Sequence, residues 1–243
     1  RSITDVEPIV VSWPPFENSF WTSLNRIGQV SELVVLVHTD EGITGIGEAH
    51  GGSMHYIDNT GVAHISGAGS TVTDILEPLL IGENPLDNER LWSKMFGLTY
   101  QKGWSQIGAT RQQILAAMAA VDIALWDIKG KAANMPVWRL LGGYSNTVPC
   151  YVTGGYYQDG KTIDDLTAEC KSYVETGYNA IKLKIGGVPV EEDVDRVTAV
   201  REAVGPDIDI MVDVNEGYDV RTAIRAARLL EPLDIRWLEE PVH

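Results

Sequence analysis

The sequence predicts an α/β protein, with a small α+β domain followed by the opening of a parallel β/α domain. Three features carry this prediction. Two apolar strand segments flank a turn at residues 39–42, a long amphipathic helix spans residues 110–131, and strands and helices alternate after residue 148. Such alternation is typical of parallel strands joined by helical crossovers.

The composition indicates a folded, acidic protein. Hydrophobic residues make up 44% and charged residues 22% of the 243 residues, which is the balance of a globular chain. The formal net charge of −15 would repel nucleic acid and anionic membranes, so neither is expected as a partner. No apolar run approaches the roughly 18 residues of a membrane span. Cys150 and Cys170 form no CxxC pair, which favours reduced thiols and a cytoplasmic location.

The α+β part begins with a strand and a loop within the first thirty residues. The β-branched run 33–37 and the segment 43–48 then predict a β-hairpin. Residues 51–70 are weakly patterned and are expected to form a loop. Beyond them, apolar residues recur at three- and four-residue steps, which predicts helices. These helices cover residues 74–80, 86–100, 110–131 and 137–141.

The β/α part is predicted to contain four strands and three helices. The strands cover residues 148–153, 180–185, 208–214 and 236–239, and the helices cover 163–176, 190–204 and 220–230. A closed eight-stranded barrel of this kind needs roughly 250 residues. Because only four strands fit before residue 243, we expect the sequence to be an incomplete piece of a longer protein.

Two lysines, Lys182 and Lys184, stand two residues apart on one predicted strand. Alternate strand residues face the same side, so both ammonium groups project together, into the barrel if Ile181, Leu183 and Ile185 face the helices. Repulsion and burial lower the pKa of a lysine, which makes at least one of the pair a candidate base. Two solvated lysines at a strand end are the open alternative.

Two carboxylates, Asp213 and Glu239, end the next two predicted strands, and Asn215 follows Asp213 on the same face. Strand ends of a β/α barrel meet at one rim. Neighbouring carboxylates are unfavourable unless they share a proton or a cation, and oxygen ligands suit Mg²⁺. The alternative is that Asp213 caps a helix and Glu240 forms a surface ion pair.

A rival motif lies between a predicted strand and a helix. Residues 155–162, from Gly155 to Thr162, match the phosphate-loop pattern GxxxxGK[ST], which predicts a nucleotide-binding protein as an alternative function. Backbone amides cradle phosphate only where small residues leave them accessible. Tyr156, Tyr157 and Asp159 fill this loop, so a chance match is favoured.

Several segments together resemble the enolase superfamily, in order and over nearly the whole chain. Residues 180–186 (AIKLKIG) resemble its KxK strand, and residues 211–215 (MVDVN) and 237–241 (WLEEP) resemble its first two metal-ligand strands. Residues 40–48 are similar to its capping-domain hairpin, and residues 120–127 and 140–143 to the region after that domain.

The resemblance implies the mandelate racemase and muconate-lactonizing enzyme branch, and the Glu-Glu-Pro ending favours the mandelate racemase side. It implies a capping domain over residues 1–130, a linker over 131–147, and the first half of a modified, TIM-type β/α barrel over 148–243. The implied enzyme is a lyase or isomerase that uses Mg²⁺ to abstract the α-proton of a small-molecule carboxylate through an enediolate intermediate. It would be a dehydratase of an acid sugar or hydroxy acid, or a racemase or epimerase, and a symmetric homo-oligomer.

By matched position, the resemblance makes Lys184 the base and Lys182 its electrostatic partner. It makes Asp213 and Glu239 ligands of Mg²⁺, and it places Asn215 beside the ligand sphere, near the substrate.

The resemblance also implies that capping loops around Trp21 and His50 close on the substrate. The third metal ligand and the second acid/base would lie beyond residue 243, so the 243-residue piece alone is expected to be inactive. A non-catalytic relative of the superfamily is the other alternative.

Overall fold

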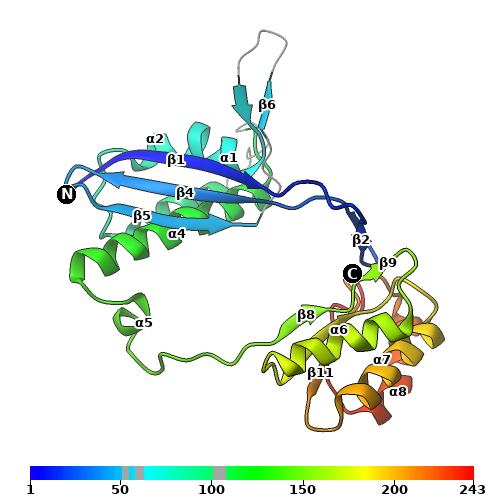
Figure 1. Ribbon diagram of the computed structural model, residues 1–243. Coiled ribbons are helices and arrows are strands. Elements are labelled where there is room, and N and C mark those ends of the chain that lie inside the picture. Colours follow the sequence, from blue (N-terminus) through cyan, green and yellow to red (C-terminus); the bar gives the residue numbers. More distant parts are fainter. Residues whose placement is uncertain (51–54, 58–62, 101–107) are drawn as a thin grey trace. The chain divides into compact units, whose positions relative to one another are not determined.

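The computed structural model describes residues 1–50, 55–57, 63–100 and 108–243, which form two compact units (Figure 1). The first unit comprises residues 1–14 and 30–147, and the second comprises residues 15–29 and 148–243. The segment 15–29 therefore belongs with the C-terminal part of the chain, although it lies between two strands of the first unit in sequence.

An antiparallel sheet forms the centre of the first unit. Its strands are β1 (Ile3–Ser12), β4 (Ser31–Thr39) and β5 (Thr44–Ala49), in the order β1-β4-β5. Leu33, Val35 and Val37 of β4 are almost fully buried, while the residues between them are partly exposed. This period of two means that one face of the sheet packs on the core, and the predicted hairpin around residues 39–42 is confirmed.

A long helix, α4 (Arg111–Ala133), covers the sheet (Figure 1). It begins with a capping box, in which the Thr110 hydroxyl accepts from Gln113 N and the Gln113 side chain accepts from Thr110 N. It ends at Asn134, which takes the left-handed conformation (φ 49°). The helix predicted over residues 110–131 is therefore confirmed.

Shorter elements complete the first unit. They are β6 (His55–Ile57), β7 (Ala63–Ile65), α1 (Ala68–Thr71), the π-helical turn η1 (Val72–Leu76), α2 (Glu77–Leu80), α3 (Asn88–Phe96), the 3₁₀ turn η2 (Gly97–Tyr100) and α5 (Val137–Leu140). The loop predicted over residues 51–70 is wrong where the structure describes it, because β6 pairs with β7 and α1 begins at Ala68. Strands of three residues are too short to show a period.

Across the described ranges, no helix is long and apolar enough to cross a membrane.

Strand β5 crosses α4 at Gly45 and Gly47, where the two backbones touch. A Cβ atom at Gly45 would overlap the carbonyl oxygen of Ala124, and one at Gly47 would overlap that of Ala120. The absence of side chains at these two positions therefore allows the helix to lie directly on the strand.

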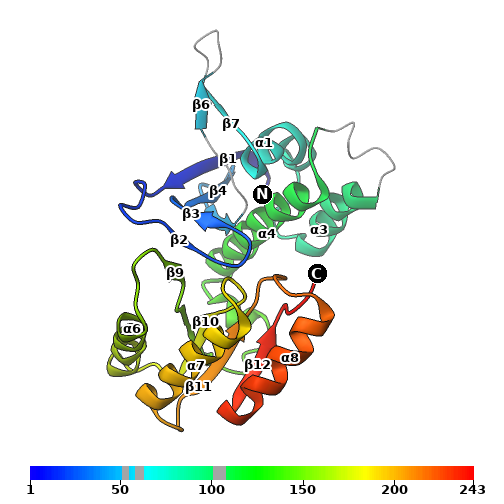
Figure 2. The same ribbon diagram turned by 90° about the vertical axis from the view of Figure 1, so that its right-hand side faces the viewer.

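A parallel sheet forms the second unit. Its strands are β8 (Val152–Gly154), β10 (Ala180–Lys184), β11 (Asp209–Asp213) and β12 (Ile235–Glu239), in the order β12-β11-β10-β8. The helices α6 (Ile163–Glu175), α7 (Val190–Val204) and α8 (Val220–Leu230), the last extended by the 3₁₀ turn η4 (Glu231–Leu233), lie on one face of the sheet (Figure 2). The predicted alternation of strand and helix is thereby confirmed.

A second, smaller sheet in this unit was not predicted. It consists of β2 (Phe20–Trp21), β3 (Arg26–Ile27) and β9 (Tyr157–Gln158), in the order β3-β2-β9. Phe20 pairs with Gln158 and Trp21 with Tyr157, so the segment 15–29 is attached to the loop that follows β8.

The backbone contact between β5 and α4 leads to a stability prediction. Gly47→Ala is expected to lower the free energy of unfolding by about 3 kcal/mol, because the added methyl group must push the strand away from the helix. Gly97→Ala is the matched control, since Gly97 has helical angles and open space around its Cβ position. Urea unfolding measures both variants, and equal stability of the two would contradict the close packing at Gly47.

Candidate active site

Three neighbouring strands of the parallel sheet end in charged residues that share one register row. Lys184 of β10 pairs with Asp213 of β11, and Asp213 pairs with Glu239 of β12. Hydrogen-bonded strands lie about 4.8 Å apart. The row therefore brings one ammonium group and two carboxylates together at the carboxyl edge of the sheet.

The two faces of β10 differ in chemistry. Ile181 and Leu183 are at most 2% exposed and belong to the core under the helices. Lys182 and Lys184 lie on the opposite face and are only 8% and 7% exposed. They are thus buried side by side and are not solvated surface lysines.

Each lysine contacts the carboxylates directly. Lys184 Nζ lies 2.7 Å from Asp213 Oδ2 and donates to Asn215 Oδ1 at 2.9 Å. Lys182 Nζ lies 2.6 Å from Glu239 Oε1 and 3.3 Å from Asp213 Oδ2. Asp213 is therefore bound by both lysines, and Lys182 joins Asp213 to Glu239.

These contacts favour the charged forms of the groups. Burial opposes the charge of Lys182, but the hydrogen bond to Glu239 and the charge of Asp213 outweigh it and raise the pKa of Lys182. Burial likewise opposes the charge of Asp213, but the hydrogen bonds from Lys184 and from Asn215 N lower its pKa. Repulsion between the lysines was expected to lower a lysine pKa, but for Lys182 the two carboxylates reverse the direction.

The two carboxylates fit a divalent cation. In proteins, Mg²⁺ binds oxygen ligands and is often held by one or two carboxylates, with water or substrate completing its shell. The Lys182 ammonium already contacts an oxygen of Asp213 and an oxygen of Glu239, so both carboxylates reach one cationic centre. Asp213 and Glu239 could therefore hold Mg²⁺ as a pair.

Asn215 holds the Asp213 carboxylate from the other side. It adopts a left-handed backbone conformation (φ 49°), and its N–H donates to Asp213 Oδ1 at 2.9 Å. Its side-chain oxygen accepts from Lys184, so Asn215 contacts both a proposed ligand and the proposed base.

Two aromatic rings, which no sequence pattern indicated as part of the site, lie beside the lysines. Lys182 Nζ lies 5.5 Å from the ring centre of Tyr151, and Lys184 Nζ lies 5.6 Å from that of Tyr156. Trp237 Nε1 donates to Glu239 Oε2 at 3.0 Å and its ring contacts Tyr151 edge to face. Trp237 stands two residues before Glu239 on the same strand. Because alternate strand residues face the same side, the sequence could have predicted that Trp237 lies beside Glu239.

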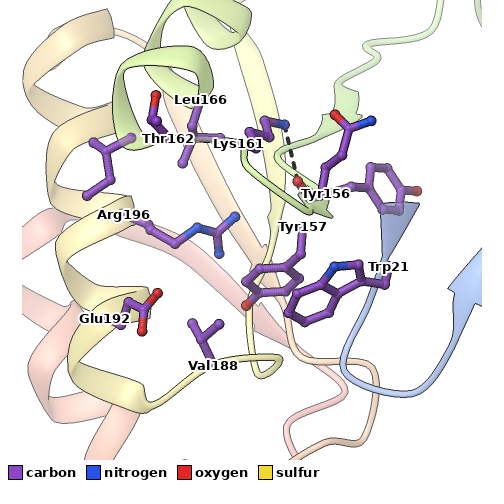
Figure 3. Close-up of a pocket in the computed structure, with 11 residues that line it drawn as sticks. Trp21, Tyr156, Tyr157, Lys161, Thr162, Leu166, Val188, Glu192 and Arg196 are labelled. Carbon is purple, nitrogen blue, oxygen red and sulfur yellow. Dashed lines mark hydrogen bonds between the residues drawn. The ribbon is translucent and has the colours of Figure 1, made fainter. Parts of the chain in front are cut away.

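The two predicted capping-loop residues have other partners. Trp21 stacks on Tyr157 at 4.3 Å between ring centres and lines a cavity of about 160 Å³ in the second unit (Figure 3). His50 lies in the first unit, where its exposed ring hydrogen-bonds to Glu32 at 3.0 Å. Contact of either residue with substrate stays a prediction.

The residues of the phosphate-loop pattern have structural roles. Lys161 pairs with Glu169. It also donates to the carbonyl of Tyr156 (Figure 3). The same Glu169 carboxylate accepts from Gly155 N at 2.9 Å, while Thr162 caps α6. A carboxylate of the chain itself therefore binds the loop amide and the lysine that would hold phosphate, and the nucleotide-binding alternative is not favoured.

Comparison with known sequence families assigns both parts of the chain. The profile described as mandelate racemase / muconate lactonizing enzyme, N-terminal domain, matches residues 4–142. The profile described as enolase C-terminal domain-like matches residues 165–243. The fold class is accordingly the expected one, an α+β capping domain followed by part of a β/α barrel.

Individual relatives agree with this assignment. Arabinonate dehydratase of Saccharolobus solfataricus is 39% identical over 206 residues, which cover 85% of this chain and 51% of that protein. N-succinyl-L-Arg/Lys racemase of Bacillus cereus is 35% identical over 237 residues, which cover 94% of this chain and 56% of that protein. A racemase structure from Streptomyces coelicolor A3(2) with bound magnesium aligns with a TM-score of 0.81 at 31% identity, covering 99% of this chain and 63% of the other.

The chain thus spans about half the length of the curated relatives it matches. Family profiles match both units, and the second unit carries the lysines and carboxylates of the expected motifs at the ends of adjacent strands. The chain belongs to the mandelate racemase and muconate lactonizing enzyme branch of the enolase superfamily.

Proposed function

We propose that this protein catalyses Mg²⁺-dependent abstraction of the α-proton of a small carboxylate substrate, as a dehydratase, racemase or epimerase. The observation that carries the proposal is the row Lys184–Asp213–Glu239, with Lys182 bridging the two carboxylates. Relatives named as a dehydratase of arabinonate and as a racemase of N-succinyl amino acids support the reaction class.

The chemistry explains why such a cluster is needed. A proton next to a carboxylate is a very weak acid, because its removal places a second negative charge on the substrate. When bound, Mg²⁺ would hold the substrate carboxylate and stabilise that developing charge. Preorganised cationic groups do the same at low cost, because they need no rearrangement as the charge appears.

Different residues of the chain would bind the metal ion, take the proton and stabilise the substrate charge. Asp213 and Glu239 would hold the ion. The backbone N–H of Asn215 keeps the Asp213 carboxylate in place. Lys184 is proposed as the base that takes the α-proton. Lys182, which lies on the same buried face, would stabilise the negative charge of the substrate.

The proposal includes the division of the chain into a capping domain over residues 1–130, a linker over 131–147 and the first part of a barrel over 148–243. In this arrangement the segments around Trp21 and around His50 would close on the distal end of the substrate. Acid sugars, hydroxy acids and N-acylated amino acids are the substrate classes to examine.

Removal of the base gives the first test. In the full-length protein, Lys184→Ala is expected to slow exchange of the substrate α-proton with deuterated water by about 100-fold to 10,000-fold, the usual contribution of a general base. The measurement is proton NMR with a panel of acid sugars, hydroxy acids and N-succinyl amino acids in deuterated buffer. Lys171→Ala, on the exposed side of α6, is the matched control and should keep the wild-type rate. Unchanged exchange in Lys184→Ala would remove Lys184 from the role of base.

Removal of one ligand charge gives the second test. Asp213→Asn keeps the shape of the side chain but is expected to weaken Mg²⁺ binding at least about tenfold, because the oxygen ligand loses its charge. Asp209→Asn is the matched control, since Asp209 lies on the same strand at the other end and pairs with Arg236. Isothermal titration of the full-length proteins with Mg²⁺ measures both. Equal affinities of the two variants would exclude Asp213 as a ligand.

A further inference from the structure

The carboxyl end of β10 is held on one side by a residue that the proposed mechanism does not use. Strand pairing between β8 and β10 ends where Leu183 pairs with Gly154. In the next row, Gly155 turns away with a left-handed φ of 64°. The backbone carbonyl of Lys184 therefore has no hydrogen-bond partner on strand β8. Lys184 is the residue proposed as the base.

The side chain of Arg196, on α7, supplies hydrogen bonds to the backbone at this point. Its Nη1 donates to the carbonyl of Lys184 at 3.1 Å, and its Nη2 donates to the carbonyl of Gly155 at 2.8 Å. The guanidinium thus spans the two strand ends where the backbone ladder stops. A planar fork with fixed donors suits this task, because it holds both carbonyls in one geometry.

The guanidinium is itself held by buried neighbours. Asp193 Oδ1 accepts from Arg196 Nη1 at 2.8 Å and from the Tyr157 hydroxyl at 2.6 Å. The Arg196 guanidinium lies 4.1 Å from the ring centre of Tyr157, and Figure 3 shows these two side chains next to each other. Asp193 is 1% exposed and the Arg196 side chain 12%. The arginine is therefore fixed by charge, by hydrogen bonding and by ring stacking.

The same carboxylate organises the loop after β10. Gly186 N donates to Asp193 Oδ2 at 2.7 Å, and Gly187 N donates to the Tyr157 hydroxyl at 3.1 Å. The amides of Gly186 and Gly187 are thus tied to the Arg196–Asp193–Tyr157 cluster, whereas the Ile185 amide donates to the Asp213 carbonyl of β11. The sequence held a signal for Asp193, which falls at helical spacing between the buried Val190 and Val197, although it stands in an acidic run.

We propose that Arg196 is a positioning residue for Lys184, and that Asp193 and Tyr157 hold Arg196 in place. The inference rests on the proposed function in assigning Lys184 as the base. Arg196 fixes the backbone of Lys184, and thereby the place of its ammonium group, whereas Asp213 and Glu239 keep their own strand contacts. Loss of Arg196 therefore affects the proton-transfer step and spares metal binding.

The chain offers a matched control on the same helix. Arg201 also donates to backbone carbonyls, those of Leu233 at 3.0 Å, Gly205 at 2.9 Å, Ile208 at 2.6 Å and Asp234 at 3.1 Å. Ile208 and Asp234 precede β11 and β12, so Arg201 acts at the opposite ends of the strands. Substitution of either arginine costs structural hydrogen bonds, but only Arg196 contacts the residue proposed as the base.

The kinetic experiment compares Arg196→Gln with Arg201→Gln in the full-length protein, using the panel carboxylate that the wild type exchanges. Arg196→Gln is expected to lower kcat about a hundredfold, as a small displacement of a catalytic group does, with KM and Mg²⁺ affinity changed less than about threefold. Arg201→Gln is expected to lower the melting temperature similarly while kcat stays within about twofold. Equal kcat values in the two variants would overturn the proposal.

Arg196→Lys separates charge from geometry. Its ammonium keeps the positive charge beside Asp193 but cannot span two carbonyls as a fork does. It should restore most of the melting temperature but less than a tenth of the lost kcat, and full recovery of kcat would contradict a positioning role. If Arg196→Gln does not fold, this variant takes its place in the kinetic comparison.

A substrate-free measurement keeps the inference distinct from the proposed function. Amide hydrogen exchange of Gly186 and Gly187, whose amides are bonded to Asp193 and Tyr157, should become at least about tenfold faster in Arg196→Gln and remain unchanged in Arg201→Gln. If the wild type exchanges no panel carboxylate, the proposed function fails, and this measurement still shows whether Arg196 holds the end of β10. Unchanged amide exchange would overturn the positioning role whatever the activity.

Discussion

The candidate site depends on compensation of charge within a few neighbouring side chains of a parallel sheet. Lys182, Lys184 and Asp213 are buried, where an unpaired charge would be costly. Each of them contacts at least one opposite charge, and Lys182 and Asp213 each contact two. Because adjacent strands bring residues of one row close together, the strand order β12-β11-β10 turns residues far apart in the sequence into one cluster. Without that order, the same residues would be unrelated surface charges.

The sequence was sufficient to predict the elements that bury one face. The helix over 110–131 and the strands that end in Lys184, Asp213 and Glu239 each repeat apolar residues at a clear period, and the structure places them within a few residues of the predicted bounds. Elements of two or three residues, such as β2, β6 and β9, have no period to detect. The pairing of Phe20 with Gln158 is set by tertiary contact between distant segments, which local pattern cannot reveal.

The sequence predicted the residues of the candidate site that carry its main charges, but not the residues that hold them in place. Lysines and carboxylates at strand ends stand out in sequence, whereas Arg196 looks like an ordinary charge of a helix surface and Asp193 is marked only by its spacing from Val190 and Val197. Only the folded structure shows that their side chains are buried against the end of β10. The phosphate-loop pattern fails for a related reason, because residue order does not reveal that Glu169 already binds the loop. Residues that position others are thus harder to find from sequence than residues that act directly.

The crossing of β5 over α4 limits how the first unit can change during evolution. Most clashes in a protein core can be relieved by a smaller side chain in the partner element. At Gly45 and Gly47 the opposing atoms are backbone carbonyls of Ala124 and Ala120, which every amino acid carries. No substitution in the helix can make room for a methyl group on the strand, so a second-site suppressor in α4 is not available. Variation at these two positions would require the helix axis itself to shift.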